Sequence, residues 1–191
     1  MAVVHTFLAG DRQVGKTTAI RRFLQHCGLT ADGIMTYWQH DNEDDHLFLA
    51  PYMMVGHPTQ RHLVATGRPP DATKAVPVFE TAGVQILGTC GHADVIVMDE
   101  LGSLESGAPA FQEAVMRRII GDVPIIGVLK RSSTPFLDQL RAHPSIQTLE
   151  VTPANRDAMP ALIASRLGLN WSKTGNHLLP GTEDRKCNET Q

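Results

Sequence analysis

One motif near the start of the chain strongly limits the folds that the chain can adopt. It is Gly10-Asp-Arg-Gln-Val-Gly15-Lys16-Thr17. This stretch fits the pattern G-x-x-x-x-G-K-[ST] without a mismatch, and roughly 0.004 such matches are expected by chance in a chain of this composition. An apolar run of strand length, Ala2–Ala9, precedes it. From Lys16 onward apolar residues recur at helical spacing, up to Gly28, which is well placed to end the helix. The pattern therefore predicts a phosphate-binding loop between a strand and a helix.

Each residue type in this loop suits a bound polyphosphate. Glycines let backbone N–H groups turn inward, and the helix that starts at the loop adds free N–H groups and the positive end of its dipole. We expect Lys16 to contact the β- and γ-phosphates and the Thr17 hydroxyl to ligate Mg²⁺, the predicted cofactor. The predicted nucleotide-binding residues of the loop are Gly10, Asp11, Arg12, Gln13, Val14, Gly15, Lys16, Thr17 and Thr18.

A second acidic segment supplies the partner that such a loop needs. The run from Val95 to Met98 is apolar and ends in Asp99 and Glu100. We expect Asp99 to support the magnesium ion, as the acid at the end of this strand does in phosphate-loop enzymes. Glu100 points to the opposite face of the strand and is the predicted catalytic residue that orients an attacking water. An acid in that position favours hydrolysis over transfer to another substrate.

The order of elements predicts the fold class. Two strand-like runs, Gly33–Gln39 and Leu47–Val55, flank an acidic tip and indicate a β-hairpin. The tip lacks the glycine and spacing of a calcium loop, so we interpret it as a solvated turn. A Gly/Pro-rich link follows at Gly67–Asp71. The later elements are predicted as a helix over Phe79–Cys90, a strand over Asp94–Glu100, a helix over Phe111–Ile119, a strand over Val123–Leu129, a helix over Phe136–Arg141, a strand over Ile146–Val151 and a helix over Asn155–Leu167.

Apolar strands that alternate with helices predict an α/β fold of the P-loop NTPase type. Its mostly parallel sheet is covered by helices on both faces, with the β-hairpin inserted after the first helix. We expect one domain over residues 1–169 and a polar, flexible tail over residues 170–191.

Composition excludes few classes of function. The chain has 191 residues and a formal net charge of −3, so no overall basic field indicates a nucleic-acid partner. No apolar run approaches the ~18 residues of a membrane span, and the start of the chain is expected to be a strand and not a leader. The cysteines Cys27, Cys90 and Cys187 are far apart, which favours a reduced, cytoplasmic protein without a zinc motif. No protein partner can be predicted.

At this point the chain resembles a known family, the small P-loop nucleoside-triphosphatases first described from thermophilic bacteria and archaea. The resemblance runs from Val3 to about Leu167. The segments that carry it are Gly15-Lys-Thr-Thr18, Gly33-Ile-Met-Thr36, Val78-Phe-Glu80, Ala93-Asp-Val-Ile-Val-Met-Asp99-Glu100-Leu-Gly102-Ser-Leu-Glu105, Phe111, and Val151-Thr-Pro-Ala-Asn155-Arg156-Asp157. It implies Mg²⁺-dependent hydrolysis of ATP, GTP and other triphosphates with little base selectivity.

The resemblance also implies a strand order. The strand Val123–Leu129 is expected between the loop strand and the acidic strand, so that Lys130 and Arg131 at its end face the γ-phosphate. Arg131 is then a predicted catalytic residue. The chain departs from the family pattern in two places. The loop interior, residues 11–14, is more charged than usual, and Ser103 stands where the family usually has proline, next to the segment that ends at Glu105.

The strand Ile146–Val151 is expected beside the loop strand at the sheet edge, so that the loop after it opens beside the nucleotide. Asn155 and Arg156 are then predicted to contact the base, Asn155 at its edge and Arg156 on its face. The alternative is that Asn155 only caps the last helix and that Arg156 is a surface residue.

Two other functions use the same loop. One is a small-molecule kinase, which usually carries an arginine-rich lid; the close arginine pairs here, Arg21-Arg22 and Arg117-Arg118, both fall in predicted helices. The other is a nucleotide-dependent switch or assembly factor with little turnover.

Overall fold

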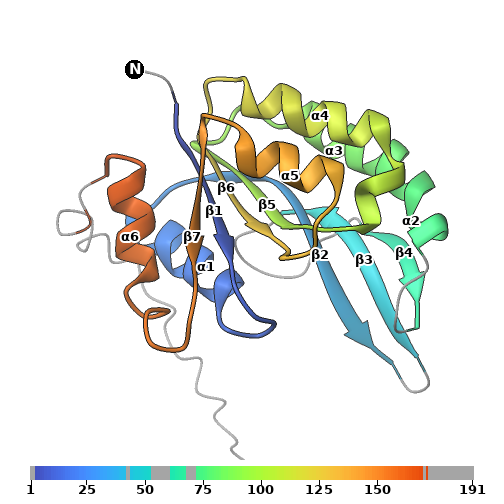
Figure 1. The fold of residues 1–191 in the computed structure, drawn as a ribbon, viewed down its shortest axis with the longest axis horizontal. Helices are drawn as coiled ribbons and strands as arrows, with labels where there is room; N and C mark the ends of the chain where they lie inside the picture. The colour runs from blue at the N-terminus through green and yellow to red at the C-terminus, as the bar shows by residue number, and fades with distance from the viewer. Residues whose placement is uncertain (1–2, 42–43, 53–60, 68–71, 170, 172–191) are drawn as a thin grey trace, which may run out of the picture.

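In the part of the chain that the structure describes, the sheet contains seven strands: β1 His5–Ala9, β2 Ala31–His40, β3 Asp45–Pro51, β4 His62–Thr66, β5 Val95–Leu101, β6 Ile125–Leu129 and β7 Ile146–Glu150. The computed structural model describes residues 3–41, 44–52, 61–67, 72–169 and 171. The strand order is β4-β3-β2-β5-β6-β1-β7 (Figure 1). All neighbouring pairs from β2 to β7 are parallel, whereas β3 and β4 are antiparallel additions. The predicted α/β fold with a mostly parallel sheet is confirmed.

Helices cover both faces of this sheet (Figure 1). α1 (Lys16–Cys27) and α6 (Met159–Arg166) pack on one face, where they bury a cluster of apolar side chains. The other face carries a second apolar cluster and, among the described residues, the helices α2 Ala72–Val78, α3 Val84–Thr89, α4 Pro109–Ile119 and α5 Pro135–Ala142. A π-helical turn, Phe79–Gly83, joins α2 to α3, and a 3₁₀ turn, Leu104–Gly107, precedes α4.

Strand order brings distant segments to one edge. β6 lies between β5 and β1, and β7 is the edge neighbour of β1, as predicted. His5 fixes the opposite end of β1: its imidazole is buried between the carbonyl of Ile119, at 2.7 Å, and the amide of Ile125, at 3.1 Å. Because parallel strands share a direction, the segments that follow β1, β5, β6 and β7 all emerge at the same edge of the sheet.

Among the described strands and α-helices, β4 and α2 were not predicted. β4 adds a third antiparallel strand to the expected hairpin by pairing with β3, directly before the Gly/Pro-rich link. α2 extends the helix predicted from Phe79 back to Ala72. Pro77 lies inside α2, where it cannot donate a backbone hydrogen bond. The π-helical turn begins at Phe79, directly after the end of α2.

Element ends also differ from the predictions. β1 begins at His5 and not at Ala2, and β3 ends at Pro51, so that the rest of the predicted run to Val55 lies mostly outside the described residues. α6 begins at Met159 and not near Asn155, since Pro160 lacks an N–H and is tolerated only in the first turn of a helix. Of the predicted tail only Trp171 is described, and its ring stacks on His26 at 3.8 Å between centroids.

Candidate active site

The loop between β1 and α1 adopts a conformation that requires its glycines. Gly10 has φ +146° and Gly15 has φ +111°, both in the region that side chains disfavour. A Cβ atom on Gly10 would also lie 2.4 Å from the carbonyl oxygen of Val151, directly after β7. The loop is therefore packed against the end of the edge strand, and glycine at position 10 permits that approach.

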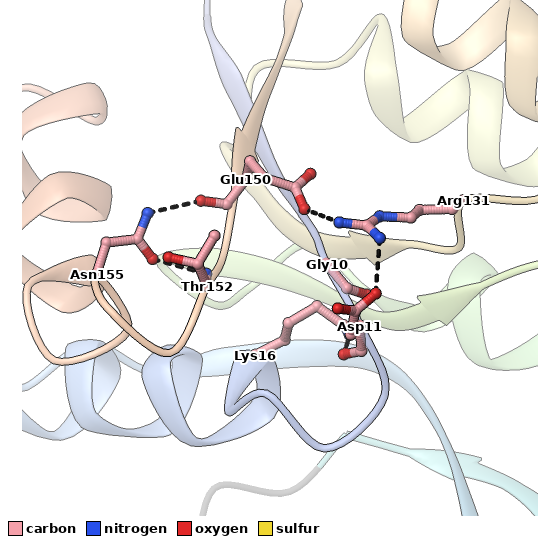
Figure 2. Close-up of polar contacts among 7 residues, drawn as sticks. All are labelled: Gly10, Asp11, Lys16, Arg131, Glu150, Thr152 and Asn155. Atoms are coloured by element: carbon pink, nitrogen blue, oxygen red, sulfur yellow. Dashed lines mark hydrogen bonds and ion pairs between the residues drawn. The ribbon is translucent and has the colours of Figure 1, made fainter.

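Lys16 begins α1 and reaches back over this loop. Its Nζ donates to the carbonyl oxygens of Gly10, at 2.9 Å, and Asp11, at 2.7 Å (Figure 2). The ammonium group is thus satisfied by the oxygens of its own loop. A phosphate group presents the same kind of acceptor with more negative charge, so the ammonium can exchange carbonyl oxygens for phosphate oxygens.

Asp99 lies near the end of β5, on the α1 side of the sheet. It is buried, with 7% of its surface exposed, and its carboxylate accepts a hydrogen bond from the Thr17 hydroxyl. Burial raises the pKa of Asp99 to about 6, against the opposing effects of Thr17, Arg21 and Lys16. A bound cation would favour the charged form of this carboxylate.

The Thr17 hydroxyl and the Asp99 carboxylate fit a magnesium ion. Both are hard oxygen donors, they come from two different elements, and they are in contact. Mg²⁺ typically takes one or two protein oxygens and completes its coordination with phosphate oxygens and water. Among the described residues no group of three or more His, Cys, Asp or Glu side chains could hold a metal. The donor set therefore suits an ion that arrives with a nucleotide.

Glu100 follows Asp99 at the end of β5 and lines the same cavity. Its Oε1 is 2.8 Å from Nζ of Lys130, which follows β6 directly, and 30% of its side chain is exposed. Gly102 makes room for this pair, because a Cβ atom there would lie 2.7 Å from Cδ of Lys130. The charge of Glu100 is thus balanced by a lysine, while its carboxylate remains accessible from the cavity.

Glu105 is a buried acid near this pair that sequence reasoning assigned no role. Only 2% of its surface is exposed, and its Oε2 accepts the amide of Gly102 at 2.9 Å. Burial raises the pKa of Glu105 to about 7. Ser103 has helical backbone angles at the start of the 3₁₀ turn, so a serine in place of proline still permits this geometry. In the sequence, the signal that could have indicated a role for Glu105 was its position in the segment that carries the family resemblance.

These groups surround one cavity of about 730 Å³ at the carboxyl edge of the sheet. Its walls bring together most of the predicted site residues, together with an apolar wall, Trp38, Leu47 and Leu104, that the sequence analysis did not identify. The lining residues are Gly10, Asp11, Arg12, Gln13, Gly15, Lys16, Thr17, Thr18, Trp38, Leu47, Asp99, Glu100, Ser103, Leu104, Lys130, Arg131 and Ser132. The volume is in the range of small-molecule sites. Val14 instead points into the core.

Arg131 lies on the rim of the cavity. Its Nη1 is 2.6 Å from Oδ1 of Asp11 in the phosphate loop, and its Nη2 donates to Glu150 at the end of β7 (Figure 2). Arg131 thus reaches the phosphate loop, and its expected position facing the γ-phosphate stays a prediction. In this structure its partners are two carboxylates.

Asn155 and Arg156 lie outside the cavity lining. Oδ1 of Asn155 accepts the amide of Thr152 at 2.8 Å, and its Nδ2 donates to the carbonyl of Glu150 at 2.9 Å (Figure 2). The amide of Asn155 therefore shapes its own loop. Arg156 is exposed, and its stem lies next to the phosphate loop, since a Cβ atom on Gly15 would be 3.7 Å from its Cδ.

The arginine pairs of the predicted helices have structural partners. Arg118 donates to the carbonyl oxygens of Leu87 and Gly88 at the end of α3. Arg22 pairs with Asp157 at 3.4 Å, and Arg117 lies 3.8 Å from Glu113 one turn away on α4. These contacts agree with the prediction that these arginines belong to helix faces.

Comparison with known proteins places this geometry in a family. A family model described as NTPase matches residues 5–164. The chain belongs to this NTPase family. The predicted resemblance is confirmed, and the matched region contains the phosphate loop, both acids of β5 and the loop after β7.

Individual relatives agree with this membership. The chain is 27% identical to the nucleoside-triphosphatase THEP1 of Thermofilum pendens over 176 residues, which cover 87% of this chain and 97% of that protein. It is 24% identical to the THEP1 of Natranaerobius thermophilus over 87% of this chain and 98% of that protein. These relatives are nucleoside-triphosphatases, in agreement with the predicted class of enzyme.

Solved structures support the fold alone. The crystal structure of THEP1 from Aquifex aeolicus matches with a TM-score of 0.57 and 20% identity, over 87% of this chain and 99% of that one. The solution structure of a human cancer-related nucleoside triphosphatase matches with a TM-score of 0.55 and 22% identity, over 85% of this chain and 96% of that one. Among the described residues, no helix is both long and apolar enough to cross a bilayer.

Proposed function

We propose that this chain hydrolyses nucleoside triphosphates with Mg²⁺ to the diphosphate and phosphate. One observation carries the proposal: the end of β5 presents two acids in different environments to the cavity of the phosphate loop. Asp99 is buried against Thr17, whereas Glu100 is accessible and paired with Lys130. Binding of a metal-bound triphosphate and activation of a water thus fall to separate side chains.

The loop residues would hold the triphosphate. Backbone amides at the start of α1 and the Lys16 ammonium bind phosphate oxygens, with Lys16 giving up its contacts to Gly10 and Asp11. Thr17 and Asp99 are the residues that would hold Mg²⁺, which when bound neutralises charge on the phosphate oxygens. The burial of Asp99 keeps its carboxylate in a site from which most water is excluded.

Glu100 would orient the nucleophile. A water held by its carboxylate attacks the γ-phosphorus, and the bond from that phosphorus to the β–γ bridging oxygen breaks, so that the diphosphate leaves. The proton of the water passes through Glu100 to phosphate or solvent. Lys130 forms an ion pair with the Glu100 carboxylate, and Arg131 on the rim would stabilise negative charge that develops during the transfer.

We further propose that the loop after β7 meets the base. Arg156 lies beside Gly15, where its guanidinium can stack on a purine or pyrimidine face without distinguishing between bases. Asn155 supports this loop through Thr152 and Glu150, and any contact of Asn155 with the base edge would come at the expense of one of these bonds. Hydrolysis of ATP, GTP and further triphosphates with little selectivity is the corresponding expectation.

A phosphate-release assay on ATP, GTP, CTP and UTP, with Mg²⁺ and with a chelator, tests this function. Release from all four nucleotides that stops when the metal is removed supports it. Absence of release at saturating Mg²⁺-nucleotide, with nucleotide bound, would instead favour a switch or assembly factor.

The apolar wall of the cavity favours a second candidate, phosphoryl transfer to a small acceptor. Trp38, Leu47 and Leu104 border the space near Glu100 and have no evident role in binding a triphosphate. In that case Glu100 would take the proton of an acceptor hydroxyl. With a metabolite extract present, diphosphate formed in excess of phosphate released would indicate transfer, and equal amounts would indicate hydrolysis.

A cytoplasmic location is also part of the proposal. Cys90 is a buried thiol, which suits a reducing compartment. Recovery of the protein with its thiols oxidised from an extracellular fraction would contradict this location.

A further inference from the structure

One guanidinium joins three segments at the rim of the cavity. Arg131 contacts Asp11 of the phosphate loop, with Nη1 2.6 Å from Oδ1, and Glu150 at the end of β7 through Nη2 (Figure 2). The two carboxylates raise the pKa of Arg131, Glu150 most. All three side chains are about half exposed or more, so the contacts can exchange with other charged groups.

The backbone of the sheet fixes one side of this arrangement. Glu150 pairs in register with Ala9, the last residue of β1 before the phosphate loop, and Val151 donates to the carbonyl of Ala9 at 2.7 Å. Asn155 holds the Glu150 carbonyl at 2.9 Å. Since β6 lies on the other side of β1, Arg131 and Glu150 face each other across the start of the phosphate loop.

The two carboxylates differ in their relation to the nucleotide. Asp11 belongs to the loop that would enclose the phosphates, and its negative charge competes with theirs. Glu150 belongs to the sheet and need not move when a nucleotide binds. A guanidinium has donors on two sides and can hold a carboxylate with one and a phosphate oxygen with the other.

We propose that Glu150 is a positioning residue that holds Arg131 for the γ-phosphate, and that Asp11 stands in for a phosphate oxygen until the nucleotide arrives. This inference rests on the proposed function. On nucleotide binding Arg131 exchanges Asp11 for phosphate and keeps Glu150. The two acids therefore have opposite effects: Glu150 supports turnover, whereas Asp11 weakens nucleotide binding.

A double-mutant cycle on Glu150 and Arg131 tests the positioning role. Glu150→Gln should lower kcat about two- to fivefold with little change in KM, which is the range expected for an exposed ion pair. In an Arg131→Ala background the same substitution should leave kcat unchanged. Glu113→Gln is the matched control, because it also removes one exposed negative charge, on α4, and should leave the rate as it is.

Binding of ATP and AMP to the Asp11→Asn variant, measured by calorimetry, tests the stand-in role. ATP should bind about two- to fivefold more tightly than to the wild type, and AMP, which has no γ-phosphate, should gain less. Weaker ATP binding, or an equal gain for AMP, would overturn the role of Asp11. The positioning role of Glu150 would be overturned by an unchanged kcat for Glu150→Gln. It would also be overturned if Glu150→Gln lowered kcat equally in the Arg131→Ala background. Failure of the proposed function itself would be recognised by a different result, namely turnover at the wild-type rate in the Glu100→Gln variant.

Discussion

Asp99 and Glu100 are adjacent in the chain, but their surroundings differ. Asp99 is buried on the α1 side of β5 and contacts Thr17, whereas Glu100 faces the cavity beside Lys130. The two consecutive acids at the end of β5 thus contact different partners. Substitutions at the two positions should therefore fail in different ways.

Glu100→Gln should keep the dissociation constant for Mg²⁺-ATP within about twofold and lower kcat by roughly a hundredfold or more, since an amide cannot take the proton of the attacking water. Asp99→Asn should instead require more Mg²⁺ for half-maximal rate, because the proposed magnesium-binding side chain would lose its charge. Equilibrium binding and magnesium titrations distinguish the two. Wild-type rates in Glu100→Gln would remove this residue from the mechanism.

Glu105 has a different consequence, which concerns stability. Its pKa in the folded protein is about 7, above the value near 4.3 of an exposed glutamate, because burial favours the neutral carboxyl. The stability that this group contributes is fully present below about pH 4 and is lost as the pH rises through about 7. The raised pKa of Asp99 likewise lowers the stability of the folded protein as the pH rises through about 6. The nucleotide-free protein should thus melt at lower temperature at pH 8 than at pH 5.

Glu105→Gln should reduce this pH dependence. The amide oxygen of glutamine can still accept the Gly102 amide, but the side chain no longer titrates. A gain on the order of 2 kcal/mol at pH 8 corresponds to a melting temperature about 4–8 °C higher than that of the wild type, with little difference at pH 4. Thermal melts of both proteins across this range provide the measurement. Parallel curves for the two proteins would show that Glu105 does not titrate in this range.

Among the elements, β7 and the loop after it connect most closely to the phosphate loop. Val151 contacts Gly10, Glu150 binds Arg131, and Arg156 lies against Gly15. An edge strand with these three contacts brings the last part of the chain to the phosphate loop. The loop after β7 is therefore the element through which base contacts can be tested.

Arg156→Ala should raise KM for ATP and GTP by similar factors, about two- to tenfold, and leave kcat unchanged, since stacking on a guanidinium does not distinguish between bases. Steady-state kinetics with both nucleotides measure this effect. Arg166→Ala, at the far end of α6, is the control for loss of one arginine. An unchanged KM for both nucleotides would leave Arg156 as a surface residue of its loop.

Much of the element order followed from the sequence, because the loop motif, the acidic strand and the alternation of strands and helices are local patterns. The place of β6 between β5 and β1 came from the family resemblance and is confirmed. β4 was missed because a short strand is hard to recognise without its partner β3. α2 was missed because Pro77 usually marks the end or the start of a helix.

The side-chain contacts of the site were less predictable. Arg131 and Asp11 are 120 positions apart in the chain, and their ion pair depends on the register of β6, β1 and β7. The burial of Glu105 depends on the turn after β5. Such contacts arise from tertiary packing, for which no local pattern exists. The roles of the individual site residues stay predictions until they are substituted.

For the molecule as a whole, the sheet places all groups of the site at one edge. Helices on both faces bury the two apolar clusters, and the cavity opens where β1, β5 and β6 end. The chain as a whole has a net charge of −3 and does not attract a polyphosphate. The attraction comes from this edge, where Lys16, Lys130 and Arg131 lie together. The proposed function requires that this edge binds and hydrolyses nucleoside triphosphates.

Phosphate release from ATP by the wild type and by a folded Lys16→Ala variant tests that claim most directly. Nζ of Lys16 donates to two carbonyl oxygens of its own exposed loop, so its removal should leave the melting temperature close to that of the wild type. We expect Mg²⁺-dependent release by the wild type and a rate roughly a hundredfold lower or more for the variant. Equal rates for the two folded proteins would contradict the assignment of the active site to this loop.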